Sequence, residues 1–368
     1  MKSFIVVASL AAAILAGAAI AADPHRHHSE WIERTAEYGG EKPGPRFLHT
    51  FGISEDGSSM LVFGGRQAGW HDYYGDTFVL DTVHKEWVNL GVMDPSPSPR
   101  FGAWGFTYHG GFYLFGGLIY VEGNSSSDKE TLVEYNDLWR FDFAARTWEL
   151  IPTKNTPNPR GLHLFNIVNN TGVLFGGKFG CHKNRVKCPV TEWNNEDVYN
   201  DTWTLNLKTM EWTQVMTPVA PFPRYETASF VYNGQLHTFG GRTYPTKDCE
   251  LKNDIWKFDF DRNTWVEISV AKNSPLPHVR NAVSAVPFGS MFYITHGAAT
   301  CDDAWLDDTW CFDFTFGTWR RVISPVFPRQ REAFQALNFN GKYFMFGGKD
   351  LHVIGEEIAF NDIWTFDL

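Results

Sequence analysis

The chain has 368 residues, of which 42 are acidic and 32 are basic, so its formal net charge is −10 at neutral pH. This balance argues against general binding to nucleic acids or anionic membranes, because both need a basic surface. The 15 Trp, 31 Phe and 33 Gly residues are typical of a repetitive all-β fold.

The first 22 residues differ in character from the rest of the chain. Lys2 precedes an apolar run from Phe4 to Ile20, and Ala19-Ile20-Ala21 supplies small residues for cleavage. This pattern is typical of a secretory signal peptide, whereas a membrane anchor needs about 20 apolar residues held between positive flanks. We therefore expect residues 1–22 to be removed, residues 23–29 to form a flexible tail, and the mature protein to be secreted with no membrane span.

One order of features recurs six times in the remaining chain: Pro-Arg, an apolar strand, Gly-Gly, an Asn-Asp-x-Trp strand and a final Trp. The average spacing is about 57 residues, which lies in the range of propeller blades. The Gly-Gly copies are Phe63-Gly64-Gly65, Phe115-Gly116-Gly117, Phe175-Gly176-Gly177, Phe239-Gly240-Gly241, a degenerate His296-Gly297-Ala298, and Phe346-Gly347-Gly348.

The second copy shows how one repeat is built. Pro99-Arg100 opens a strand that runs to about residue 108, and a His-Gly-Gly turn leads to a second strand over 112–115. A long polar loop follows, and then strands over 136–142 and 146–150. Short aromatic and β-branched runs separated by Gly and polar turns predict antiparallel strands. Four such strands make one blade of a β-propeller.

These repeats resemble kelch repeats over residues 30–368, which implies a single all-β, six-bladed propeller. The sixth copy ends at residues 361–368 with a third strand and no fourth. Residues 30–34, which include Trp31, could supply the missing strand from the other end of the chain. That pairing would close the ring and remove two exposed sheet edges. We expect a propeller closed by its N-terminal strand, and we expect it to be monomeric.

Basic residues recur at two positions that the strand directions place on one face. The residues at the start of the innermost strands are Arg46, Arg100, Arg160, Arg224, His278 with Arg280, and Arg329, and those after Gly-Gly are Arg66, Lys178, Arg242 and Lys349. Converging guanidinium groups would bind carboxylate, phosphate or sulfate groups. The alternative is that the repeat arginines pair with the repeat aspartates and tie the blades together.

The same face is predicted to carry the long loops 66–76, 118–136, 178–200, 242–253, 298–307 and 349–361, and such loops commonly carry function. His49, Trp104, His163, Glu226, Arg331 and Glu332 occupy early positions on the innermost strands. Glu226 and Glu332 could form a catalytic acid/base pair across the channel. A Glu beside an Arg could instead be a structural ion pair.

The kelch resemblance implies a recognition surface, although some kelch propellers are enzymes, among them bacterial N-acetylneuraminate epimerases. We therefore expect a secreted binding module that recognises an extracellular protein or an anionic glycan or small molecule through the arginine-ringed face. The alternative is an epimerase-like or mutarotase-like enzyme acting on an acidic sugar.

The cysteines and sequons agree with export. The expected disulfides join Cys181 to Cys188 and Cys249 to Cys301, and Cys311 is expected to be a buried free thiol. Asn124 and Asn169 are expected to be glycosylated. No metal site or cofactor is expected, because GxSxG, Walker and HExxH motifs are absent from the sequence.

Overall fold

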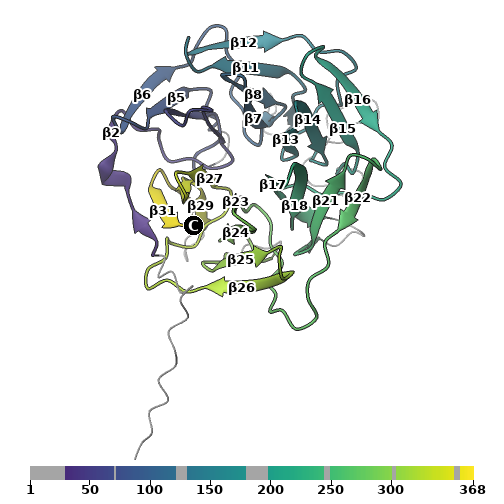
Figure 1. Cartoon of the computed structure of the whole chain (residues 1–368). Coiled ribbons are helices and arrows are strands. Elements are labelled where there is room, and N and C mark those ends of the chain that lie inside the picture. The colour runs from purple at the N-terminus through teal and green to yellow at the C-terminus, as the bar shows by residue number, and fades with distance from the viewer. Residues whose placement is uncertain are drawn as a thin grey trace, which may run out of the picture.

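The computed structural model describes residues 30–69, 72–121, 131–179, 198–243, 249–300, 304–351 and 357–368. Six antiparallel sheets of four main strands surround a central axis, as Figure 1 shows. The predicted six-bladed propeller is therefore confirmed. The expected signal peptide and tail lie outside the described residues.

The first three blades follow one another in chain order, each with its first strand innermost. Blade one contains β3 (Thr50–Ile53), β4 (Ser59–Phe63), β5 (Thr77–Asp81) and β6 (Glu86–Gly91), with the short β2 (Gly39–Gly40) parallel to β6. Blade two contains β7 (Trp104–Tyr108), β8 (Gly111–Phe115), β11 (Leu138–Asp142) and β12 (Thr147–Ile151). Blade three contains β13 (Leu164–Val168), β14 (Thr171–Phe175), β15 (Thr202–Asn206) and β16 (Glu211–Val215).

The remaining blades repeat this order, and the last uses both ends of the chain. Blade four contains β17 (Ala228–Tyr232), β18 (Gln235–Phe239), β21 (Ile255–Asp259) and β22 (Thr264–Glu267). Blade five contains β23 (Ala285–Phe288), β24 (Met291–Thr295), β25 (Thr309–Asp313) and β26 (Thr318–Val322). Blade six contains β27 (Gln335–Phe339), β28 (Lys342–Phe346), β31 (Ile363–Asp367) and the N-terminal β1 (Ile32–Glu33).

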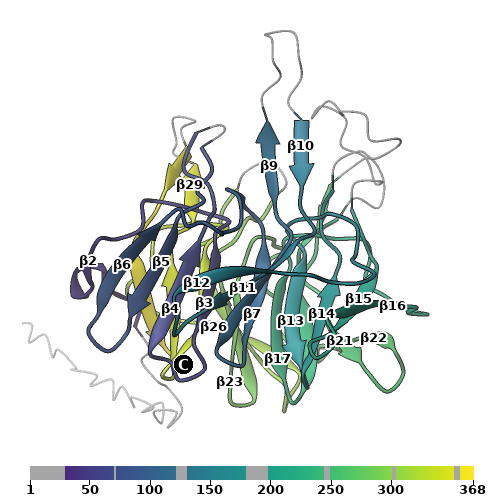
Figure 2. The same ribbon diagram turned by 90° about the horizontal axis from the view of Figure 1, so that it is seen from above.

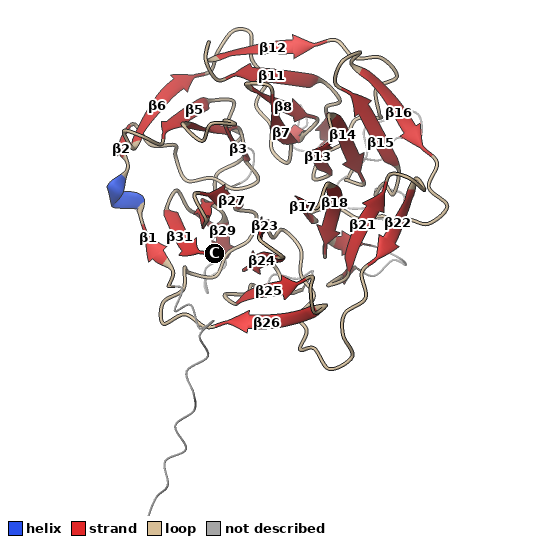
Figure 3. Cartoon of the chain, in the orientation of Figure 1, coloured by secondary structure: helices blue, strands red, loops and turns tan. Residues whose placement is uncertain are grey.

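The ring closes as the sequence predicts. Strand β1 pairs antiparallel with β31, and Trp31 just before it is buried between blades five and six. The Trp31 indole donates a hydrogen bond to Thr309 of blade five, and Trp148 and Trp265 likewise donate to Thr77 and Thr202 of the blades before them. Trp31 therefore fills the inter-blade position that each fourth-strand Trp fills elsewhere. A 3-10 turn, η1 (Thr35–Glu37), follows β1, as Figure 3 shows.

The Gly-Gly pairs lie where neighbouring blades approach most closely. The second glycine amide of each blade donates to the carbonyl of the next blade's repeat arginine, as Gly65 does to Arg100 at 2.8 Å. A Cβ on Gly64, whose φ is +65°, would lie 2.6 Å from that carbonyl oxygen. Glycine at Gly64 is therefore favoured both by its left-handed backbone and by the contact between blades, although His296 takes the equivalent place in blade five with a φ of +58°.

Three additional hairpins lie between the second and third strands of their blades. They are β9 (Leu118–Val121) with β10 (Thr131–Glu134), β19 (Arg242–Thr243) with β20 (Glu250–Leu251), and β29 (Lys349–Leu351) with β30 (Glu357–Ala359). Figure 2 shows β9 and β10 standing well above the blades on one face. We call this the loop face. The opposite face, the turn face, carries the tight turns between first and second strands, such as His109-Gly110.

Candidate functional site

The repeat arginines are structural ties between strands of one blade. Arg160 is fully buried, and its Nη1 and Nη2 lie 2.6 and 2.9 Å from the two carboxylate oxygens of Asp201. Its Nη1 and Nε also donate to the carbonyls of Gly176 and Asn158, and its guanidinium lies 3.9 Å from the ring centre of Tyr199. Every donor group is thus directed at a partner inside the protein.

The same bidentate pair is present in all six blades. The pairs are Arg46–Asp76, Arg100–Asp137, Arg160–Asp201, Arg224–Asp254, Arg280–Asp308 and Arg331–Asp362. Each arginine is at most 1% exposed. Burial raises the pKa of Asp254, but the hydrogen bonds and charge of Arg224 outweigh that effect and hold the pKa below its usual value.

The expected ring of ligand-binding arginines therefore needs correction. Arg46, Arg100, Arg160, Arg224 and Arg280 are buried and neutralised by aspartate, so a bound anion would have to displace a carboxylate that already satisfies them. In blade six the repeat position belongs to Arg331, whereas Arg329 is half-exposed and pairs with the buried Asp350. The alternative reading of the sequence, arginine–aspartate pairing within the repeats, is the one that the geometry supports.

A closed circle of backbone hydrogen bonds surrounds the propeller axis. The residue two places after each repeat arginine donates its amide to the carbonyl of the equivalent residue in the preceding blade, with N–O distances between 2.7 and 3.0 Å. All six residues have left-handed φ angles between +51° and +63°. We call them the neck residues: Leu48, Gly102, Leu162, Glu226, Ala282 and Ala333.

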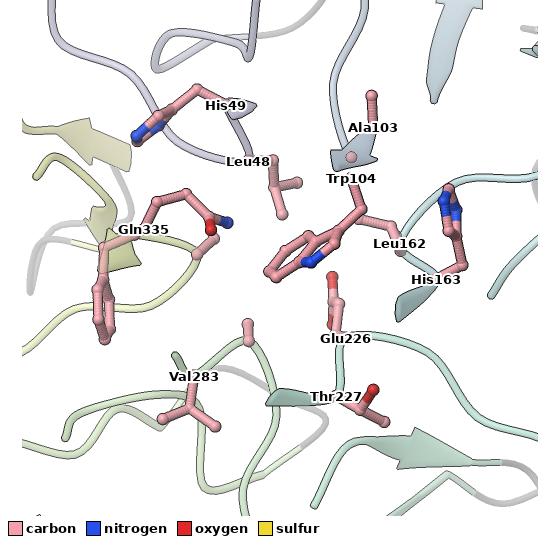
Figure 4. A pocket seen from close by; sticks show the side chains of 14 residues that line it. Leu48, His49, Ala103, Trp104, Leu162, His163, Glu226, Thr227, Val283 and Gln335 are labelled. Carbon is pink, nitrogen blue, oxygen red and sulfur yellow. The ribbon is translucent and has the colours of Figure 1, made fainter. Parts of the chain in front are cut away.

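A small cavity lies at the neck, and it is lined by the neck residues together with the one or two residues that follow each of them in the chain. All six blades contribute to its wall, which is mostly apolar. Figure 4 shows Trp104, Glu226 and Gln335 directed toward its centre, while the imidazoles of His49 and His163 point away into the blades. Apolar walls with a few polar groups directed at one point are typical of ligand sites.

Glu226 supplies the one carboxyl group among the described residues that line the cavity. Its carboxylate accepts a short hydrogen bond from the Asn281 side-chain amide of blade five. His49 and His163 are neutral, because burial and the nearby Arg46 and Arg160 hold their pKa values well below the usual range. The cavity therefore has a single negative charge at its wall.

The kelch-repeats domain described as KLHDC2/KLHL20/DRC7 matches residues 25–217 and 191–368, which together span nearly the whole chain. The chain belongs to the kelch-repeat family. This kelch chain is 26% identical to human host cell factor 1 over 372 aligned residues, which cover 91% of this chain and 17% of that protein. It is 28% identical to human kelch domain-containing protein 3 over 252 residues, covering 66% of this chain and 59% of the other.

The kelch chain thus spans less than two thirds of the length of these relatives, and of host cell factor 1 only about a sixth. Among solved structures, the one titled "Structure of YjhT" superposes with a TM-score of 0.65 at 16% identity. The superposition covers 88% of this chain and 95% of the other. At that identity the likeness supports the propeller fold alone.

The two glutamates proposed as an acid/base pair occupy different layers of the kelch propeller. Glu226 is a neck residue and lines the cavity. Glu332 lies one place before the neck residue of blade six, outside the cavity wall, with its carboxylate 3.5 Å from Lys349 Nζ. Lys349 is also 2.8 Å from Glu357, and these carboxylates hold its pKa above the usual value despite burial. The geometry therefore does not place the two glutamates on one substrate.

The basic residues after Gly-Gly form the layer between the neck and the loop face. Arg66, Lys178, Arg242 and Lys349 each pair through the backbone with the residue that follows a repeat arginine. The guanidinium of Arg66 lies between 5.2 and 5.9 Å from the ring centres of Phe47, Tyr73 and Phe101. Tyr73 and Tyr120 stack on Phe101 with centroid distances of 5.6 and 5.7 Å. We call these five residues the aromatic platform: Phe47, Arg66, Tyr73, Phe101 and Tyr120.

Only some of the cysteines and sequons named in the predictions lie among the described residues. Cys311 is a buried free thiol, as expected. Cys249 is disulfide-bonded, and the described residues do not include its partner; Cys181, Cys188 and Cys301 lie outside them, as does Asn124. Asn169 is exposed in the turn between β13 and β14 on the turn face.

No group of three or more metal-binding side chains occurs within the part of the chain that the structure describes. Within the same ranges, no helix is long and apolar enough to cross a membrane.

Sequence reasoning placed His49, Trp104, His163 and Glu226 in the channel, and all four line the cavity. It missed the neck as a unit. The signal was present as the residue two places after each repeat arginine, where five copies are Leu, Gly or Ala and one is Glu.

Proposed function

We propose that this kelch propeller is a protein-binding module that contacts its partner through the loop face. The observation that carries the proposal is the asymmetry of the two faces. The three added hairpins rise from the loop face, with the aromatic platform in the layer beneath it, whereas the first-to-second-strand connections on the other face are mostly tight turns. Variable segments on a rigid scaffold are the usual location of binding sites.

The composition of the loop face supports a protein partner. Tyr, Phe and Arg side chains that are held rigid lose little conformational entropy on binding, and they are enriched among residues that dominate interface energies. Tyr73 and Tyr120 of the aromatic platform are partly exposed side chains of this kind, and both are held by stacking on the buried Phe101. An anionic glycan is a weaker candidate, since the arginines that would bind it are buried in ion pairs.

The proposal is tested by site-specific photo-crosslinking with a matched pair of positions in blade two. Val121, exposed at the tip of β9, and His109, exposed in the turn between β7 and β8, are replaced in turn by a benzophenone amino acid. We expect a discrete covalent adduct from Val121 and none from His109 when the protein is irradiated in its native surroundings. Equal labelling from both positions, or adducts from His109 alone, would contradict the assignment of the loop face.

We further propose that the module works outside the cell as a single propeller. The support is the sequence pattern of residues 1–22 and the disulfide at Cys249. Mass spectrometry of the secreted product tests the expected cleavage, the Cys181–Cys188 and Cys249–Cys301 pairings, and glycosylation at Asn124 and Asn169. Retention of residues 1–22 in the cell-associated protein would contradict export.

A further inference from the structure

We propose that the central cavity is a binding site for an organic cation, an alkylammonium or guanidinium group. The proposal rests on different residues from those of the loop face. Its first support is the carboxylate of Glu226, which Figure 4 shows directed into the cavity. Among the described residues Asn281 is its one hydrogen-bond donor, and it contacts a single carboxylate oxygen, Oε2. The other oxygen, Oε1, is available to a ligand, and an ionised carboxylate can only accept hydrogen bonds.

No described residue that lines the cavity carries a positive charge to offset this carboxylate. The six repeat arginines nearest the neck are each neutralised by a bidentate aspartate. The two histidines in the wall are neutral. A carboxylate in a mostly apolar wall gains most from a ligand that carries the opposite charge and donates hydrogen bonds.

Two further polar side chains fit the same ligand. The Trp104 indole reaches across the cavity beside Glu226, and no residue in the described ranges accepts a hydrogen bond from it. Its ring offers a face to a cation, an interaction that strengthens when water is excluded. The Gln335 carboxamide enters from blade six, also without a hydrogen-bond partner among the described residues, and its oxygen can accept from an ammonium.

The backbone holds Glu226 in place at a cost. Its φ of +54° is in the left-handed region, which is unfavourable for a residue with a Cβ, yet the circle of neck hydrogen bonds fixes it there. The other neck residues are small or apolar and add no polar group to the cavity. One charged residue in a six-fold ring therefore gives the cavity a defined polarity and a defined position for the ligand's charge.

The test compares three probes of the same shape and different charge by calorimetric titration: n-butylammonium, n-butanol and butyrate. We expect n-butylammonium to bind at least about tenfold more tightly than the other two, since one charge-assisted pair in a partly desolvated site is worth about that factor. If butyrate bound as tightly as n-butylammonium to the unmodified protein, the proposal would be overturned without any variant.

Variants locate the site. Glu226→Gln keeps the size and the Asn281 contact but removes the charge, so we expect it to abolish the preference for n-butylammonium. Glu332→Gln is the control, because it removes a nearby carboxylate outside the cavity, and we expect unchanged binding. If Glu226→Gln does not fold, Trp104→Phe is expected to weaken n-butylammonium binding severalfold, because it keeps an aromatic face of weaker attraction. An unchanged affinity in whichever of these two variants folds overturns the assignment.

A short peptide containing an internal lysine, titrated in parallel, identifies the source of the cation. Binding of the peptide with the same dependence on Glu226 indicates a side chain of a protein partner, whereas binding of n-butylammonium alone indicates a small free amine. Either result supports a cation site. Loss of crosslinking at Val121 would leave these titrations unaffected, so the two proposals fail separately.

Discussion

Replacing Asp201 by Asn should destabilise the propeller far more than an ordinary surface substitution. Asp201 neutralises Arg160 through two hydrogen bonds of 2.6 and 2.9 Å, and it also accepts a hydrogen bond of 2.7 Å from the Trp203 indole. The asparagine amide would leave a fully buried guanidinium without a counter-charge. Breaking one partner of a buried ion pair costs about 3–5 kcal/mol of unfolding free energy.

The corresponding change in melting temperature follows from the size of the domain. For the roughly 300 residues that the structure describes, the unfolding entropy near the midpoint is about 0.6 kcal/mol per kelvin, so the loss corresponds to a decrease of about 5–8 °C. Urea denaturation and differential scanning calorimetry measure both quantities on the same protein.

A matched control uses the same substitution at a surface pair. Asp367 pairs with Lys342, and both side chains are well exposed. Because exposed ion pairs contribute about 0–1 kcal/mol, we expect Asp367→Asn to shift the midpoint by less than about 1.5 °C. If Asp201→Asn cost no more than Asp367→Asn, the arginine–aspartate pairs would not be the ties that the geometry indicates.

Three further predictions concern pH, ring closure and the neck. Burial holds the pKa of His163 well below its unfolded value, so below about pH 6.5 the unfolded chain binds a proton that the folded protein does not. The free energy of unfolding should therefore fall by about 1.4 kcal/mol per pH unit for such a histidine as the pH drops below about 6.5. Urea titrations at pH 7 and pH 5 should show a smaller loss in the variant His163→Phe. Trp31→Ala should lower the free energy of unfolding by about 3–5 kcal/mol, because the indole is 1% exposed. The neighbouring Ile32 is at an exposed position, so Ile32→Ala should lower it by less than about 1 kcal/mol in the same denaturation assay. Equal effects would argue against closure by the N-terminal strand. Gly102→Ala should destabilise the protein more than Gly110→Ala. Both glycines have a positive φ, but only at Gly102 would a Cβ lie 2.6 Å from a neighbouring side chain. Similar denaturation midpoints for the two variants would contradict the close packing of the neck residues.

Much of the fold could be predicted because the repeated residues mark where each strand and each blade begins and ends. The Gly-Gly positions, the Trp of each fourth strand and the incomplete sixth copy together required a closed six-bladed ring, and Trp31 occupies the predicted place. The strand directions also predicted which loops share a face. These inferences hold because the physical constraints, close backbone approach and packing between neighbouring blades, are the same at every junction and therefore leave the same residues in every copy.

The role of the arginines could not be decided from the sequence alone. Pro-Arg and the Asn-Asp strand lie about 30 to 40 residues apart, and only the fold shows that Arg160 and Asp201 meet. In blade six the sequence favoured Arg329, which follows a proline, although Arg331 makes the pair with Asp362. A shift of two residues along the chain changes which arginine is buried.

The neck was beyond sequence reasoning for a different reason. Left-handed φ angles are ordinarily predicted from Gly or Asn, and here they occur at Leu48 and Leu162. The closed circle of backbone hydrogen bonds imposes them, and such a circle exists only after all six blades are assembled. Its one charged member, Glu226, is the reason that we propose a site for cations where the sequence predicted a site for anions.

The most direct test of the loop-face proposal is hydrogen–deuterium exchange of the propeller alone and in complex with the partner captured through Val121. We expect added protection in β9, β10 and the segment 72–76, with no change in the turns at 109–110 and 169–170. Protection confined to those turns would contradict the proposal that this kelch propeller binds through its loop face.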